Sequence, residues 1–139
     1  PYVKDELVLV TSTGNESFRE DYIDADNLHT LDFVEREPGS GTRDVIANAL
    51  KKRDVAPLHI SAVLGSTEGI KSYLKYSGSF AFLSIHAIHQ EVLNGHLRVI
   101  EVPDLSISRW FYFISRQGFQ SRLNQKLQNI LQQGYNYSE

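Results

Sequence analysis

The chain has 139 residues, a formal net charge of −3, and neither cysteine nor methionine. This length suits one domain, and a composition with 41% hydrophobic and 22% charged residues is that of a folded globular protein. The weak negative charge excludes a strongly basic nucleic-acid binder, and the lack of cysteine excludes disulfides and thiolate metal sites. No apolar run reaches the roughly 18 residues that a membrane-spanning helix needs.

The N-terminal part predicts one buried strand and a polar connection. Residues 7–10 form an apolar, partly β-branched run closed by polar residues and Gly14. Such a run is typical of a strand that is buried on both faces, and it favours a parallel sheet. Residues 16–27 are polar and acidic, with Ile23 and Leu28 as isolated apolar anchors, and they predict a short helix or a wrapped loop.

From Leu31 onward, strands and helices alternate. Strands are predicted over 31–35, 58–64 and 80–85, and the helices that follow them over 43–52, 65–78 and 86–95. A helix after each strand, with short connections, is the pattern of βαβ units. The predicted fold class is therefore α/β, with a mostly parallel sheet flanked by helices.

The C-terminal part breaks this alternation. Residues 97–102 and 108–115 predict two strands joined by a turn, and an apolar stripe over 123–131 predicts a final helix that ends at Gly134. The aromatic run 110–113 resembles a base-stacking platform, but its aromatics are consecutive and no wider basic groove accompanies them. We interpret the run as part of a strand buried on both faces.

The strongest candidate site is the turn before the first regular helix. Gly39 and Gly41 let the backbone turn tightly, while Ser40 and Thr42 place hydroxyl groups beside the unpaired N–H groups of a helix start. Such a helix start attracts anions through its N–H groups and the positive end of the helix dipole. The alternative is that one of these hydroxyl groups only caps the helix.

A second turn repeats this arrangement at Gly65, Ser66 and Thr67, after the next strand. In open α/β sheets, ligands bind outside the carboxyl ends of the strands, so we expect the two turns to share a ligand there. Two independent helix caps are the alternative. Neither turn has the pattern of a phosphate-binding P-loop.

Catalytic and metal-binding patterns are weak. His86 and His89 lie three apart on a predicted helix near Glu91, but a metal site needs another ligand that faces the same way. Histidines at a helix end are the alternative. The chain shows no nucleophile elbow and no carboxylate pair placed for acid–base work. We therefore expect no enzyme, no cofactor and no metal.

Two segments carry a resemblance to a known family. Residues 36–43 (REPGSGTR) and 64–71 (LGSTEGIK) resemble the effector-binding domain of LysR-type transcriptional regulators, which is similar to the type 2 periplasmic binding protein fold. The resemblance extends from about Leu7 to Leu131. It departs at Phe80 and Ser84, which stand where the family often has a small residue and proline.

The resemblance implies two lobes joined by crossing strands. On this template, residues 1–139 are a fragment of the effector-binding domain, with 12–107 as the second lobe and with 1–11 and 108–139 as the crossing strands and the C-terminal part of the first lobe. Because a translation product begins with methionine and this chain has none, we expect a longer parent protein, with its DNA-binding domain before Pro1.

The implied function is to sense a small anionic metabolite between the lobes. The cleft wall of this lobe would comprise the residues of both turns, which are Gly39, Ser40, Gly41, Thr42, Gly65, Ser66 and Thr67. The resemblance also implies a cytoplasmic homo-oligomer that contacts DNA only through its N-terminal domain and does not contact a membrane. Two alternatives stay open: a solute-binding protein of a transport system, and an enzyme on a related two-lobed fold.

Overall fold

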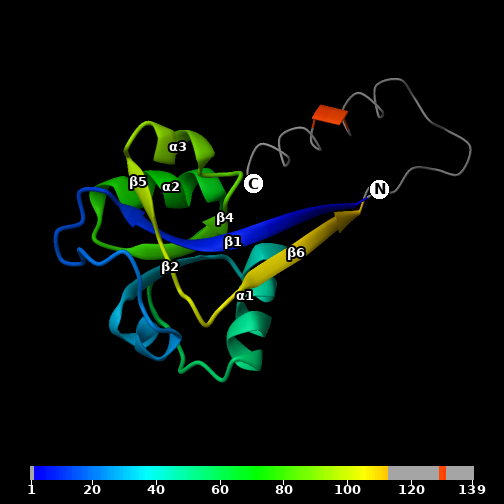
Figure 1. Ribbon diagram of the computed structural model, residues 1–139, viewed down its shortest axis with the longest axis horizontal. Coiled ribbons are helices and arrows are strands. Elements are labelled where there is room, and N and C mark those ends of the chain that lie inside the picture. Colours follow the sequence, from blue (N-terminus) through cyan, green and yellow to red (C-terminus); the bar gives the residue numbers. More distant parts are fainter. Residues whose placement is uncertain (1, 113–128, 131–139) are drawn as a thin grey trace, which may run out of the picture.

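Figure 1 shows the computed structural model of the chain, which describes residues 2–112 and 129–130. The strands are β1 (Tyr2–Ser12), β2 (Asp32–Arg36), β3 (His59–Leu64), β4 (Phe80–Ser84), β5 (Leu97–Ile100) and β6 (Ile107–Tyr112). The helices are the 3-10 helix η1 (Ala25–Thr30) and the α-helices α1 (Gly41–Lys52), α2 (Thr67–Tyr76) and α3 (His89–Leu93). The alternation predicted from Leu31 onward is confirmed.

The strands form one sheet in the order β3-β2-β4-β1-β5, and β6 also pairs with β1. β2 is parallel to β3 and β4, whereas β1 is antiparallel to β4, β5 and β6. Five of the described strands therefore run in one direction and β1 runs against them. The α/β fold class is confirmed, but the sheet is mixed rather than mostly parallel, because two of these pairings are parallel and three are antiparallel. The prediction that residues 7–10 belong to a parallel pairing is wrong. β1 is apolar on both faces because it lies in the middle of the sheet.

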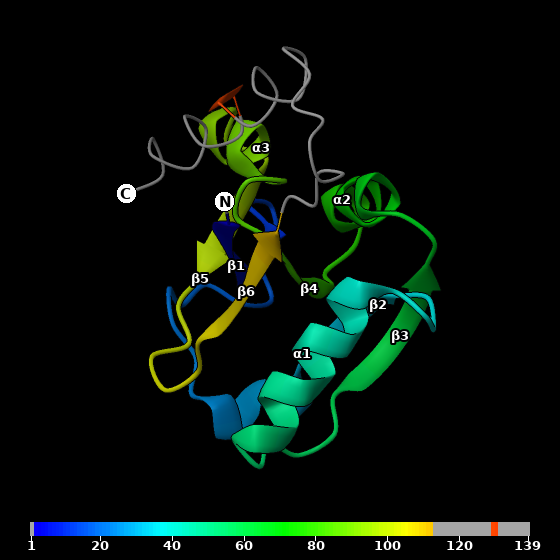
Figure 2. The ribbon, with the colours of Figure 1, turned by 90° about the vertical axis from the view of Figure 1, so that its right-hand side faces the viewer.

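Helices cover both faces of the sheet (Figure 2). On one face, Leu9, Phe33 and Phe82 pack with η1 and with the apolar side chains of α1. On the other face, Val10 and Val34 pack against α2, whose Ile70 and Leu74 are buried. The period of two along each strand sends neighbouring side chains to opposite faces, so one apolar strand supplies both layers.

β1 and β6 extend beyond the helical layers as a two-stranded ribbon (Figure 1). In this ribbon Trp110 is 48% exposed and Phe111 is 41% exposed. The prediction that the aromatic run is core is therefore wrong for these two residues, because β6 pairs with β1 at the margin of the layers. Residues 113–128 and 131–139, which hold the end of the predicted strand and all but two residues of the predicted last helix, lie outside the described residues.

The segment before η1 wraps the sheet edge as a loop, with Ile23 buried in the loop and Leu28 buried in η1 itself. Arg98 of β5 holds this loop, because its guanidinium donates hydrogen bonds to the carbonyl oxygens of Phe18 and Glu20. Within the part of the chain that the structure describes, no helix has the length and apolar character needed to cross a bilayer.

Candidate functional site

Both predicted turns lie at the same edge of the sheet. β2 and β3 are parallel neighbours, and their last residues, Arg36 and Leu64, are register partners. The turn that contains Gly39 and the turn that contains Gly65 therefore leave the sheet side by side. α1 packs on one face and α2 on the other, so the two helix starts flank this carboxyl edge from opposite sides.

The two serines of these turns cap their helices. Ser40 is the N-cap of α1, and its Oγ accepts a hydrogen bond from Arg43 N over 3.4 Å. Ser66 is the N-cap of α2, and its Oγ accepts from Gly69 N over 2.9 Å. The capping alternative is therefore confirmed for both serines, and it gives each hydroxyl group a structural role.

The two threonines have a different environment. Thr42 Oγ1 accepts a hydrogen bond from Arg109 Nη1 over 2.9 Å, and Thr67 Oγ1 accepts one from Arg36 Nη1 over 3.3 Å. A hydroxyl group that accepts from a guanidinium keeps its own hydrogen for a further acceptor. Each threonine is therefore a hydrogen-bond donor supported by a positive charge.

Arg109 joins α1 to the β1–β6 ribbon. Its Nε lies 3.0 Å from Asp5 Oδ2, and Ser84 Oγ donates to Asp5 Oδ1 over 2.7 Å. Asp5 is only 1% exposed, so both of its oxygens have partners within the fold. Ser84, at the position where the family often has proline, is thus part of a network that runs from β4 through Asp5 and Arg109 to Thr42.

A second arginine lies at the end of β2. Arg36 Nε is 3.0 Å from Glu37 Oε2, and a second nitrogen of the same guanidinium is 3.0 Å from Glu37 Oε1. This paired hydrogen bond raises the pKa of Arg36 and lowers the pKa of Glu37. The edge therefore holds two guanidinium groups, one beside each threonine.

The glycines of the two turns differ in what they contribute. Gly39 has φ +93°, a conformation that side chains rarely adopt, and it sets the turn into α1. A Cβ placed on Gly41 or Gly65 would meet no atom within 4 Å in the described part of the chain. These two glycines therefore leave open space at the edge.

His86 and His89, the two histidines considered as metal ligands, are not grouped with a third ligand in the described part of the chain. α3 begins at His89, so His86 lies in the preceding turn and the prediction that both belong to one helix is wrong. Glu91 is instead paired with Lys71 Nζ, 2.7 Å from its Oε1. Among the described residues, no group of three or more His, Cys, Asp or Glu side chains is placed to hold a metal ion.

Sequence reasoning missed Asp5, Ser84, Arg36 and Arg109 as site residues. One local signal was available. Asp5 lies on the side of β1 that carries Val3, Leu7 and Leu9, all buried, and a carboxylate in such a row needs a cationic partner.

The chain matches the model of the family described as "LysR substrate binding domain" over residues 1–136. It is 31% identical over 117 residues to a protein named "Probable RuBisCO transcriptional regulator" from Cyanidioschyzon merolae, which covers 83% of this chain and 39% of that relative. The chain thus spans well under half the length of this curated relative.

Solved structures share its fold. The Synechocystis PCC6803 CcmR regulatory domain in complex with 2-PG has a TM-score of 0.72 at 22% identity, covering 97% of this chain and 66% of that one. The effector binding domain of QuiR in complex with shikimate has a TM-score of 0.68 at 15% identity, covering 96% of this chain and 61% of that one.

Proposed function

The chain belongs to the LysR substrate-binding domain family, and on this premise we propose that it is the effector-sensing part of a transcription regulator. The type 2 periplasmic-binding-protein-like fold predicted from the sequence is confirmed by the solved relatives. The family match favours the regulator over a solute-binding protein of a transport system and over an enzyme.

The proposed ligand is a small anion held at the carboxyl edge of β2 and β3. One observation carries this proposal: Thr42 and Thr67 both accept hydrogen bonds from guanidinium groups, which leaves their hydroxyl hydrogens to donate. The N-termini of α1 and α2 add backbone N–H groups and the positive ends of two helix dipoles. All these groups favour an acceptor with negative charge, such as a carboxylate or a phosphate.

The seven predicted residues have distinct roles in this proposal. Thr42 and Thr67 donate to the ligand, Ser40 and Ser66 hold the helix starts in place, and Gly39, Gly41 and Gly65 shape and open the turns. Arg36 and Arg109 join the set as the cations behind the two threonines.

Arg109 also gives the ligand a connection to the rest of the regulator. We assign residues 12–107 to the second lobe, and residues 1–11 and 108–139 to the crossing strands and the C-terminal part of the first lobe. Arg109 lies on one crossing strand, Asp5 on the other, and Thr42 on the lobe. A ligand that binds Thr42 therefore changes the hydrogen bonding of the group that holds both crossing strands, and it favours one arrangement of the lobes.

The family match supports the rest of the proposal. DNA contact belongs to an N-terminal domain outside this chain, and the regulator acts as a cytoplasmic homo-oligomer that passes the change between lobes to that domain. The proposal includes no catalytic step, no cofactor and no membrane contact.

Calorimetric titration of the chain, and of the longer protein that carries it, with small carboxylates, phosphorylated carboxylates and sulfur oxyanions tests this proposal. We expect one of these anions to bind, and Thr42→Val and Thr67→Val each to weaken its binding by about tenfold. Thr30→Val is the matched control, because the Thr30 hydroxyl donates to Asn27 O in η1. Equal affinity of the parent and both site variants would remove these hydroxyl groups from the site.

A further inference from the structure

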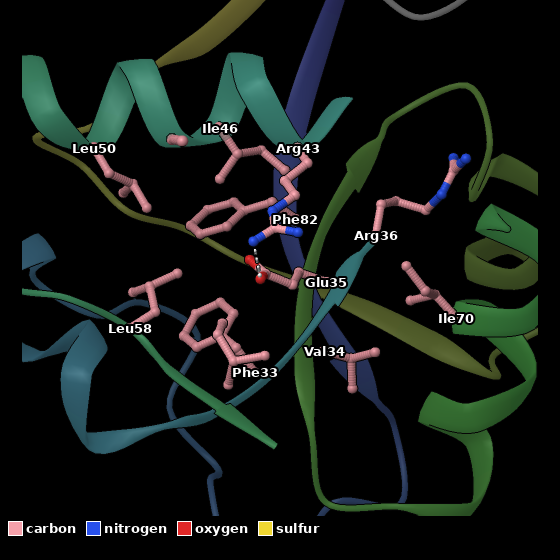
Figure 3. Close-up of a pocket in the computed structure, with 12 residues that line it drawn as sticks. Phe33, Val34, Glu35, Arg36, Arg43, Ile46, Leu50, Leu58, Ile70 and Phe82 are labelled. Carbon is pink, nitrogen blue, oxygen red and sulfur yellow. Dashed lines mark ion pairs between the residues drawn. The ribbon is translucent and has the colours of Figure 1, made fainter. Parts of the chain in front are cut away.

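A cavity of about 210 Å³ lies under α1, apart from the two threonines (Figure 3). The inner stripe of α1 forms its roof, and β2, β3 and β4 form its floor. Its apolar lining includes Phe33, Ile46, Ala47, Leu50, Ile60 and Phe82.

The layer that encloses the cavity is incompletely packed. Every side chain of α1 remains at least partly exposed, although Ile46 and Leu50 face the sheet. The residues of β3 are likewise all exposed or half-buried. On the opposite face, α2 buries Leu74 completely. Protein interiors are normally close-packed, so an apolar space of this size next to partly exposed side chains has room for a ligand.

Three charged residues, Glu35, Arg36 and Arg43, line the polar end of the cavity, and Arg36 is already paired with Glu37. Arg43 Nη2 lies 3.2 Å from Glu35 Oε1, and the two side chains are 32% and 26% exposed. Figure 3 shows this ion pair beside Phe82, with the Arg36 guanidinium directed away from it. An ion pair exposed to this degree contributes little to stability, so a ligand can separate its partners at small cost.

From this geometry we propose that the cavity binds the zwitterion of a small apolar α-amino acid, such as leucine or phenylalanine. The ligand carboxylate accepts hydrogen bonds from Arg43, its ammonium group donates to Glu35, and its side chain occupies the apolar space. A zwitterion keeps both protein charges paired, whereas a simple carboxylate leaves Glu35 without a cation and a simple amine leaves Arg43 without an anion. A cavity of roughly 150 Å³ holds benzene, so this one has room for an isobutyl or phenyl group.

The first test compares ligands on the intact chain by calorimetry and thermal unfolding. The probes are L-leucine and L-phenylalanine, with 4-methylpentanoate and 3-methylbutylamine as analogues that lack one charge each. We expect both amino acids to bind and to raise the unfolding temperature, and each analogue to bind at least about tenfold more weakly. The absence of amino-acid binding at 10 mM (about −2.7 kcal/mol), or equal binding of an analogue, overturns the proposal.

Variants then locate the bound amino acid. Glu35→Gln and Arg43→Gln remove one charge each, and we expect about tenfold weaker leucine binding in both. Glu16→Gln and Arg19→Gln are the matched controls, since their ion pair lies in the surface loop with side chains 84% and 76% exposed. Thr42→Val should bind leucine like the parent, which separates this cavity from the proposed anion site.

Filling the space gives an independent check. Ala47 lines the cavity, and Ala47→Leu places an isobutyl group over it while preserving helix propensity. Asn48→Leu, one position along α1, is the control. We expect only Ala47→Leu to abolish leucine binding. The competing occupant of the cavity is a second copy of the chain. If the molecular mass rises with protein concentration, if Ala47→Leu changes this rise and if leucine has no effect on it, the proposal is overturned.

Discussion

Asp5 and Arg109 face each other across the β1–β6 ribbon, with Arg109 Nε 3.0 Å from Asp5 Oδ2. Asp5 is 1% exposed, whereas the Arg109 side chain is 20% exposed and also reaches Thr42. A buried carboxylate is tolerated only with such a partner, so this pair determines whether the ribbon stays attached to α1.

We expect Arg109→Leu to lower the free energy of unfolding by about 3 kcal/mol, because it leaves the Asp5 carboxylate buried without its cation. Urea denaturation measures the change. Arg19→Leu is the control, since its ion pair with Glu16 is exposed and should contribute less than about 0.5 kcal/mol. A loss below about 1 kcal/mol in Arg109→Leu would contradict the role given to this pair.

The pairing of Lys71 with Glu91 predicts a pH dependence. Burial by itself raises the pKa of Glu91. The hydrogen bonds to its carboxylate, of which the one from Lys71 has the largest effect, outweigh burial and leave the pKa below its ordinary value. As the pH falls, the Glu91 carboxylate therefore takes up its proton in the unfolded state before it does so in the folded state. The stabilisation that this carboxylate provides at neutral pH is lost as the pH drops through its folded-state pKa.

We expect Glu91→Gln to lower stability by about 2 kcal/mol at pH 7, because it removes a charged hydrogen bond between α2 and α3. The difference from the parent should shrink between pH 5 and pH 3 in urea denaturation series, since the parent loses its own Glu91 charge there. Glu68→Gln serves as the control: Glu68 pairs with the same lysine but its side chain is 81% exposed. If the stability difference between Glu91→Gln and the parent did not change with pH, the protonation of Glu91 would not be coupled to folding.

His86 reports on the charge of Asp5. Burial lowers the pKa of His86 below its ordinary value, while the Asp5 charge raises it and His89 lowers it. We expect NMR titration to give a midpoint below 6.5, and Asp5→Asn to move that midpoint further down, since the favourable charge is gone. An upward movement in Asp5→Asn would show that the two groups do not interact as the structure indicates.

Two glycines of the candidate site make a matched backbone test. Gly39→Ala should cost about 1 kcal/mol, because φ +93° strains any residue with a Cβ although no described atom lies within 4 Å of it. Gly65→Ala has the same free space without a positive φ, so we expect unchanged or slightly higher stability. Equal effects of both substitutions in urea denaturation would contradict the assignment of strain to Gly39.

Local patterns predicted the elements that depend on neighbouring residues. The helix starts at Ser40 and Ser66 follow from a strand, a turn and a capping hydroxyl group within a few positions. The end of α1 at Lys52 was also predicted, although Asp54, with φ 57°, occupies the left-handed position where glycine is usual. The chain continues through it because Val55 N bonds to Leu50 O over 3.0 Å.

Long-range pairing escaped prediction. Asp5 and Arg109 are 104 positions apart, and only the register of β1 with β6 brings them together. The direction of β1 and the exposure of Trp110 depend on the same pairing, because an apolar run shows that a strand tends to be buried but not which strand lies beside it. The edge shared by the two turns was predictable, since parallel βαβ units place it there.

β1 belongs both to the ribbon and to the middle of the sheet: Leu7 is the register partner of Ile107 in β6 and of Ser84 in β4. No loop separates these two pairings, so the 11-residue strand transmits a movement of the ribbon directly to the middle of the sheet. A twist of the ribbon at Asp5 therefore moves the backbone of Leu9 and Val10, which lie between β4 and β5. The rate of amide hydrogen exchange at these two buried positions then reports on changes in the ribbon.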